Sequence, residues 1–258
     1  MQKTPLLIDF DGVLKIGSEP AKGIIEFLNF IEGNKIPAHI ISNSTLRTSD
    51  DMKAFFASKN ISLQIPSMTA AEVTFQHVKS NYKKAAVYCT DSIKNLFSEY
   101  LDYKNPEAVV VGDNGENWGY NMLNEIFGFV NSGADLIAMQ KNKFWYPEGD
   151  IPKLDAGSFI KAIEHATGKE AKLIGKPSPI YFRTALNNLG YEENQEFLML
   201  GDDIESDIEG AKNAGGKGIL IYTGKTKYPL PPDTKIKPDY EIKDLNEAIK
   251  LLEKIIEN

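Results

Sequence analysis

The sequence contains a single cysteine and only three histidines. Cys89 has no second cysteine to pair with, and because it lies in an apolar stretch we expect a buried, small hydrophobic residue. The histidines are widely separated in the chain, at His39, His77 and His165. No Cys/His metal site, phosphate-binding glycine loop or Ser-His-Asp pattern is evident, so these chemistries are not predicted.

Long basic runs and long apolar runs are also lacking. The net charge is −7, which argues against a nucleic-acid partner or an anionic membrane surface, since both attract clustered Lys and Arg. No stretch is long enough to span a bilayer and the N-terminus has no signal pattern, so we expect a cytoplasmic protein. The 258 residues, 42% hydrophobic and 25% charged, are typical of a soluble globular protein with one large or two smaller α/β domains.

The stretch Leu6–Val13 is the most informative part of the chain. Three apolar residues lead directly into Asp9, Asp11 and Gly12. A continuous apolar run of this kind predicts a buried parallel strand, with both aspartates at its carboxyl end. Open α/β sheets bind their ligands at that edge. A divalent cation would explain why two carboxylates are kept so close, although a solvated turn is a common alternative.

Apolar runs and amphipathic segments alternate along the rest of the chain, which predicts parallel strands joined by helices. The strands are expected at residues 6–8, 37–41, 85–88, 107–111, 135–139, 144–146, 172–175, 196–200 and 217–221. The helices are expected at residues 20–32, 50–59, 69–80, 91–100, 118–130, 155–167, 179–189, 206–214 and 244–256. Ser178 suits an N-cap before Pro179, and Ser206 with Glu209 suits a capping box.

The order of these elements predicts two α/β units. Residues 81–171 contain enough strands and helices for a unit of their own, inserted into the first. We therefore predict a Rossmann-like core with a parallel sheet, formed by residues 1–80 and 172–258, and a second α/β domain at residues 81–171.

Polar residues follow four of the predicted core strands or begin the next helix. Each group is unremarkable alone, but in this order all four fall at one edge of a single parallel sheet. The groups are Asp9 with Asp11, Ser42, Lys176, and Asp202 and Asp203 with Asp207.

This pattern resembles the haloacid dehalogenase superfamily of phosphatases, whose four motifs match the four groups across the whole chain. The insert resembles the large α/β cap of the p-nitrophenyl phosphatase-like subfamily, and the chain is most similar to its phospholysine-phosphohistidine-pyrophosphate phosphatase-like branch. Ser42 departs from the threonine of many relatives but keeps a hydroxyl. Asn43 and Ser44 replace a common pair of asparagines.

The resemblance implies a Mg²⁺-dependent phosphatase of small phosphorylated metabolites. Its metal ligands would be the carboxylates of Asp9 and Asp202 and the backbone carbonyl of Asp11. Asp9 would attack phosphorus and Asp11 would act as general acid and base. Ser42, Lys176 and backbone N–H groups near Gly12 would hold the phosphoryl oxygens, with Asn43 and Ser44 nearby. Outside the ligand shell, Asp203 and Asp207 would orient metal-bound water and Lys176.

The insert is expected to act as a cap that selects substrates and to offer strand edges for a homodimer. Gln140, Lys141 and Lys143 follow one of its strands, and we expect Gln140 and Lys141 to bind substrate. A solvated hairpin turn is an equal alternative for this segment.

Other functions remain open at this point. A phosphoryl-transfer mutase of the same superfamily would have to protect its phosphoenzyme from water. A receiver-like signalling module also uses aspartates, a hydroxyl and a lysine, but is typically only about 100–150 residues long. Dehalogenation would have no use for Asp11 as an acid. A binding protein that has lost catalysis would not need Asp9, Asp11 and Lys176 together.

Overall fold

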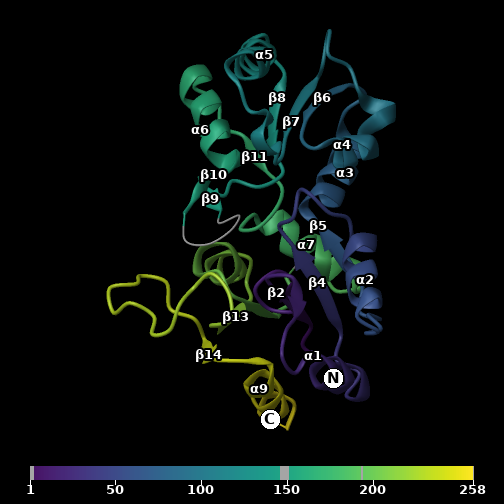
Figure 1. Ribbon diagram of the computed structural model, residues 1–258, viewed down its shortest axis with the longest axis vertical. Coiled ribbons are helices and arrows are strands. Elements are labelled where there is room, and N and C mark those ends of the chain that lie inside the picture. The colour runs from purple at the N-terminus through teal and green to yellow at the C-terminus, as the bar shows by residue number, and fades with distance from the viewer. Residues whose placement is uncertain (1–2, 146–150, 193, 258) are drawn as a thin grey trace. The chain divides into compact units, whose positions relative to one another are not determined.

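The computed structural model describes residues 3–145, 151–192 and 194–257 (Figure 1). The chain divides into two compact units, each described by itself. Unit 1 comprises Met1–Ser42, Ser49–Met68 and Lys176–Asn258, and unit 2 comprises Asn43–Thr48 and Thr69–Gly175. The predicted insert, residues 81–171, falls within unit 2. No helix in the described ranges combines the length and the apolar character needed to cross a membrane.

Unit 1 is built on a six-stranded sheet in the order β14-β13-β12-β1-β4-β5. The ladders that join β1 to β4 and β12, and β13 to β12 and β14, are all parallel. A short hairpin of β2 (Lys15–Ile16) and β3 (Glu19–Pro20) follows β1. The sheet strands are β1 (Leu6–Asp9), β4 (Ala38–Ser42), β5 (Ser67–Thr69), β12 (Leu198–Gly201), β13 (Lys217–Ile221) and β14 (Tyr240–Ile242).

Helices pack on both faces of this sheet. On one face α1 and α9 lie side by side (Figure 1), and Phe27 of α1 and Leu252 of α9 belong to the same buried cluster as Leu6, Ile8 and Ile219 of the sheet. Successive residues of a strand face opposite sides of the sheet, so position 218 faces the other side from Ile219. A Cβ at Gly218 would meet Ile208 of the helical segment on that side. The helical segments are α1 (Ile24–Gly33), α2 (Ser49–Ser58), α7 (Pro179–Asn188), a π-helical segment (Ile204–Glu209), α8 (Gly210–Asn213) and α9 (Leu245–Glu257).

Unit 2 has its own four-stranded parallel sheet in the order β11-β8-β7-β6. Helices α5 and α6 pack on one face, where Val130 and Ile160 join a buried cluster with Val109 of β7. A two-stranded antiparallel ribbon, β9 with β10, completes the unit. The elements are α3 (Ala70–Asn81), β6 (Ala85–Tyr88), α4 (Asp91–Lys94), β7 (Ala108–Val111), α5 (Tyr120–Asn131), β8 (Asp135–Ala138), β9 (Phe144–Trp145), β10 (Lys153–Leu154), α6 (Ala156–Thr167) and β11 (Lys172–Leu173), with 3₁₀ turns at Asn95–Tyr100 and Gly115–Asn117.

These two α/β units, each with a parallel sheet, confirm the predicted fold class. Two local predictions were less accurate. The helix predicted at 91–100 is α-helical only to Lys94 and continues as a 3₁₀ helix. The capping box at Ser206 is wrong: Asp203 is the N-cap, its carboxylate accepts hydrogen bonds from the N–H groups of Glu205 and Ser206, and Ser206 lies inside the helical segment. For the strand predicted at 144–146, Tyr146 lies outside the described residues.

Candidate active site

The two central strands of unit 1 carry two of the candidate aspartates at their carboxyl ends. Asp9 is the last residue of β1, and Asp202 directly follows Gly201, the last residue of β12. From β1 the chain runs outward to β4 and β5, and it later returns to the opposite side of β1 at β12. Such a switch in strand order opens a crevice at the carboxyl edge, where α/β proteins bind ligands.

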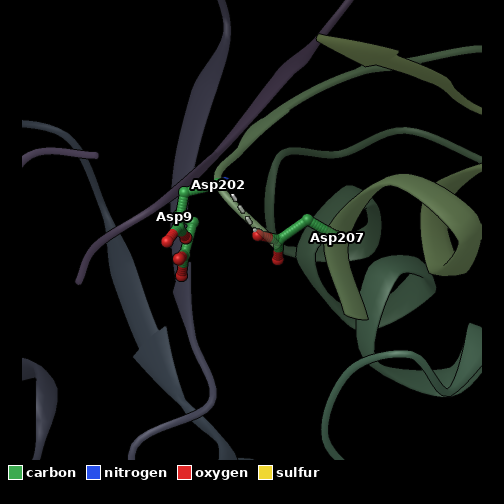
Figure 2. A group of neighbouring side chains, drawn as sticks. All are labelled: Asp9, Asp202 and Asp207. Carbon is green, nitrogen blue, oxygen red and sulfur yellow. Dashed lines mark hydrogen bonds between the residues drawn. The ribbon is translucent and has the colours of Figure 1, made fainter. Parts of the chain in front are cut away.

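A third aspartate completes a compact acidic cluster (Figure 2). One carboxylate oxygen each from Asp9, Asp202 and Asp207 lies within 4.8 Å of the other two. The residues are only 7%, 6% and 0% exposed, so water screens their charges poorly. Three buried like charges at this separation require positive charge in the same place.

Asp207 reaches the cluster from the helical segment that follows β12. Its Oδ2 accepts hydrogen bonds from the backbone N–H groups of Asp202 at 3.1 Å, drawn in Figure 2, and of Asp203 at 3.0 Å. The close approach requires a glycine at position 201, because a Cβ there would lie 2.3 Å from the Cβ of Asp207. The Asp207 carboxylate is therefore held at the end of β12 by the backbone N–H groups of Asp202 and Asp203.

Lys176 supplies one buried positive charge. Its Nζ lies 2.6 Å from Oδ1 of Asp9, 2.7 Å from Oδ1 of Asp207 and 3.2 Å from the carbonyl oxygen of Ile41. Burial disfavours the ammonium, but the carboxylates of Asp207 and Asp9 outweigh it and raise the pKa of Lys176 above its ordinary value. Lys176 is therefore a cation at neutral pH.

One lysine does not neutralise three carboxylates. Burial, together with the charges of Asp207 and Asp202, holds the pKa of Asp9 well above its usual range although Lys176 opposes the shift. Burial and the charge of Asp207 likewise raise the pKa of Asp202 to about 6. Three buried carboxylates therefore share the single ammonium group of Lys176, and further positive charge would stabilise their ionised forms. A hard divalent cation would supply it, and carboxylate oxygens are the ligands such a cation prefers.

The other residues predicted for this edge of the unit 1 sheet are Ser42, Asp11 and Gly12. Ser42 ends β4 and is buried, and its carbonyl oxygen accepts a hydrogen bond from the Tyr181 hydroxyl at 2.6 Å. The Asp11 side chain is 46% exposed, and its Oδ1 lies 2.9 Å from Nζ of Lys15. Gly12 has a φ of +88°, and a Cβ there would lie 2.3 Å from Oδ2 of Asp202. A glycine is thus required at position 12 for both backbone conformation and space.

A loop that sequence reasoning did not single out also contacts the site. Residues Thr223–Thr226 follow β13, and the N–H of Lys225 donates to Oδ2 of Asp202 at 2.5 Å. The Thr223 hydroxyl donates to the carbonyl oxygen of Gly12 at 2.6 Å. One signal in the sequence could have indicated this loop. It is a short polar segment just after a buried strand, and Asp11, Ser42 and Asp202 likewise lie at or just after the ends of their own strands.

Four predicted substrate-binding residues belong to unit 2. Asn43 and Ser44 lie in its first segment, where Ser44 Oγ accepts a hydrogen bond from the N–H of Leu46 at 3.2 Å. Gln140 is buried and its amide donates to Oδ1 of Asp155 at 2.8 Å.

Lys141 is anchored within the same unit. Its Nζ lies 2.5 Å from Oε1 of Glu164, a buried residue that also accepts the N–H of Ala171. Gln140 and Lys141 therefore both make contacts that stabilise unit 2, and their role in binding substrate stays a prediction.

Comparison with known protein families agrees with this geometry. A family model described as haloacid dehalogenase-like hydrolase matches residues 6–101, and a related HAD-hydrolase-like model matches residues 173–248. Haloacid dehalogenase-like hydrolase domain-containing protein 2 of Mus musculus is 30% identical over 239 residues, which cover 90% of this chain and 88% of the relative. The chain therefore belongs to the haloacid dehalogenase-like hydrolases.

Further relatives narrow the enzyme class. The phospholysine phosphohistidine inorganic pyrophosphate phosphatase of Homo sapiens is 28% identical over 254 residues, covering 96% of this chain and 93% of the relative. The crystal structure of a 4-nitrophenylphosphatase from Thermotoga maritima superposes with a TM-score of 0.85 at 26% identity, covering 96% of this chain and 97% of that one. Within the family, this chain is an enzyme of the phosphatase class.

Proposed function

We propose that the chain is a Mg²⁺-dependent phosphatase of small phosphorylated compounds, with Asp9 as the group that carries the phosphoryl during turnover. The observation that carries this proposal is the contact of one buried lysine, Lys176, with both Asp9 and Asp207 beside Asp202. It joins a nucleophile, a fixed positive charge and a set of hard oxygen ligands at one sheet edge.

The hydrogen bonds and ion pairs of the three aspartates indicate which of them can bind the metal. Both oxygens of Asp207 already have protein partners, the two backbone N–H groups on Oδ2 and Lys176 on Oδ1. We therefore assign the metal to the carboxylates of Asp9 and Asp202 and the backbone carbonyl of Asp11, with Asp203 and Asp207 outside the ligand shell. When bound, Mg²⁺ would supply the positive charge that offsets the repulsion between these carboxylates and a phosphate.

The chemistry assigned to the side chains takes two steps. In the first, a carboxylate oxygen of Asp9 forms a bond to phosphorus, the bond from phosphorus to the leaving oxygen breaks, and Asp11 gives that oxygen a proton. In the second, Asp11 takes a proton from water, the water oxygen bonds to phosphorus, and phosphate leaves the Asp9 carboxylate. The exposure of the Asp11 side chain suits an acid that must reach the substrate.

The phosphoryl oxygens need donors while their charge redistributes. We assign this task to the Lys176 ammonium, the Ser42 hydroxyl and backbone N–H groups near Gly12. These groups contact only the phosphoryl part of a substrate. Discrimination among leaving groups is therefore assigned to the predicted cap at residues 81–171, with Gln140 and Lys141 as candidate contacts. Asn43 and Ser44, which follow Ser42 and lie outside that range, are further candidate contacts. A homodimer formed through the cap and a cytoplasmic location also stay predictions.

A metabolite screen tests the proposal. Phosphate release is measured with Mg²⁺ and with EDTA, on a panel that includes phospholysine, phosphohistidine, pyrophosphate and 4-nitrophenyl phosphate, because the relatives are named for these compounds. We expect Mg²⁺-dependent release from at least one. Phosphoryl exchange between two sugar phosphates without release would instead indicate a mutase. A stable phosphoprotein without turnover would indicate a receiver-like module.

A further inference from the structure

The loop Thr223–Thr226 is bonded to both chain segments that supply the proposed metal ligands. One segment is the turn after β1, where the Thr223 hydroxyl donates to the carbonyl oxygen of Gly12 at 2.6 Å. The other is the turn after β12, where the N–H groups of Lys225 and Thr226 donate to Oδ2 and to the backbone carbonyl of Asp202 at 2.5 and 3.0 Å. A single loop thus links Gly12, which adjoins the Asp11 carbonyl, to Asp202.

Two more contacts hold the loop against the second turn. Nζ of Lys225 lies 2.5 Å from Oδ2 of Asp203, and the N–H of Ile204 donates to the Thr226 hydroxyl at 3.2 Å. Each of the three polar side chains of the loop therefore makes a hydrogen bond or ion pair to a segment next to the acidic cluster.

Gly224 makes the approach of the loop possible. A Cβ at this position would lie 1.9 Å from Oδ2 of Asp202 and 2.8 Å from the Cα of Gly12. Any side chain would push the Asp202 carboxylate away from its present place or move the loop off Gly12. Glycine is required here for space, since the Asp202 carboxylate and the Gly12 backbone both lie directly against it.

From these contacts we propose that Thr223–Thr226 is a positioning element that sets the orientation of Asp202 relative to the Asp9–Gly12 turn, and through it the affinity for the metal. This inference rests on the proposed function. The loop acts through backbone N–H groups, a hydroxyl and the absence of a side chain, and none of its residues is assigned to the reacting phosphoryl group. Groups that orient a ligand in this way typically contribute about 10–100-fold to metal affinity.

The test is a direct titration of Mg²⁺ into the full-length protein by isothermal calorimetry. Gly224→Ala should weaken Mg²⁺ binding by about 10–100-fold. It should also raise the Mg²⁺ concentration needed for half-maximal activity more than it lowers kcat at saturating Mg²⁺. The matched control is Gly33→Ala, at the end of α1, where an added Cβ meets nothing within 4 Å, and its Mg²⁺ affinity should equal that of the wild type.

A second pair of variants decides the matter if Gly224→Ala does not fold. Thr223→Val removes the hydroxyl at nearly constant volume and should weaken Mg²⁺ binding by about 2–10-fold, which corresponds to one hydrogen bond. Thr223→Ser keeps the hydroxyl and should restore the affinity. Thermal unfolding in EDTA confirms that each variant is folded without metal.

The outcomes separate this inference from the proposed function. A wild-type protein that binds no Mg²⁺ contradicts the proposed function itself. A wild type that binds Mg²⁺ and releases phosphate, together with folded Gly224→Ala or Thr223→Val variants of unchanged Mg²⁺ affinity, overturns only the positioning role of the loop.

Discussion

Nζ of Lys176 lies 2.7 Å from Oδ1 of Asp207, and the two side chains are 2% and 0% exposed. The other oxygen of Asp207 accepts the N–H groups of Asp202 and Asp203. One buried carboxylate therefore holds the lysine and the end of β12 at once. This places the positive charge of Lys176 beside Asp9, so the arrangement of the site depends on a residue that we do not assign to the metal or the substrate.

The first prediction concerns the stability of this buried pair. Lys176→Met leaves the carboxylate of Asp207 buried without its cation, and it should lower the free energy of unfolding in EDTA by about 3–5 kcal/mol. Urea unfolding at neutral pH measures the change. Lys59→Met is the control, because Lys59 and Glu19 form a solvent-exposed pair and the loss should be at most about 1 kcal/mol. Equal losses in the two variants would contradict the burial argument.

The second prediction concerns His39, a buried residue of β4. Burial lowers the pKa of His39 below 6.5, its ordinary value, so the unfolded chain takes up this proton at higher pH than the folded protein does. The free energy of unfolding therefore does not depend on the protonation of His39 above about pH 6.5, where the imidazole is neutral in both states. It decreases as the pH falls below that value, because the unfolded chain then binds the proton more readily.

His39→Gln isolates this contribution. The difference in unfolding free energy between wild type and His39→Gln should shift in favour of the variant between pH 7 and pH 5. The slope is at most about 1.4 kcal/mol per pH unit, the limit for one proton. Urea unfolding at several pH values measures it, and the subtraction cancels the carboxylates of the active site. Parallel stability curves for the two proteins would rule out a titrating His39.

The third prediction concerns Asp11 as the acid. Asp11→Asn should lower kcat by about 10²–10⁴-fold for alkyl phosphates, whose leaving oxygen needs a proton. Formation of the phosphoenzyme from 4-nitrophenyl phosphate should fall much less, because nitrophenolate leaves without protonation. Stopped-flow measurement of the nitrophenolate burst gives this step separately from hydrolysis. An equal loss for both kinds of substrate would assign Asp11 to another task.

The fourth prediction concerns the segment after β8. Replacing Gln140, Lys141 and Lys143 together with alanine should change the ranking of substrates more than the rate with 4-nitrophenyl phosphate. Glu164→Gln is the control, because it weakens the anchor of Lys141 while keeping the three side chains. We expect the control to change all rates by one common factor. The same uniform change in the triple variant would show that this segment only stabilises unit 2.

Much of the fold was predictable because buried parallel strands are continuous apolar runs with sharp ends. Ala85–Tyr88 and Lys217–Ile221 were predicted with their observed bounds. The short strands β5 and β14 were not predicted. Each has only three residues and lies at an edge of the sheet, and so few residues carry little hydrophobic pattern. The prediction of an N-cap at Ser206 was wrong because Asp203, three residues earlier, caps the helical segment instead.

The site was predictable only where side-chain chemistry marks it. Carboxylates and a lysine at strand ends are visible in a sequence, and the structure brings Asp9, Asp202, Asp207 and Lys176 together. The loop at Thr223–Thr226 was missed because Lys225 contacts Asp202 through a backbone N–H group, which every residue except proline has. Gly224 contributes by lacking a side chain, and its importance depends on the neighbours that only the fold provides.

The central claim is that Asp9 carries the phosphoryl group, and rapid-quench peptide mass spectrometry tests it most directly. The Asp11→Asn variant is mixed with Mg²⁺ and 4-nitrophenyl phosphate, quenched in acid within one turnover and digested. We predict one added phosphoryl group on the peptide that contains Asp9, and none when Asp9→Asn is introduced into the same variant. Nitrophenolate release without phosphoryl on that peptide, or release that persists in a folded Asp9→Asn protein, would contradict the account.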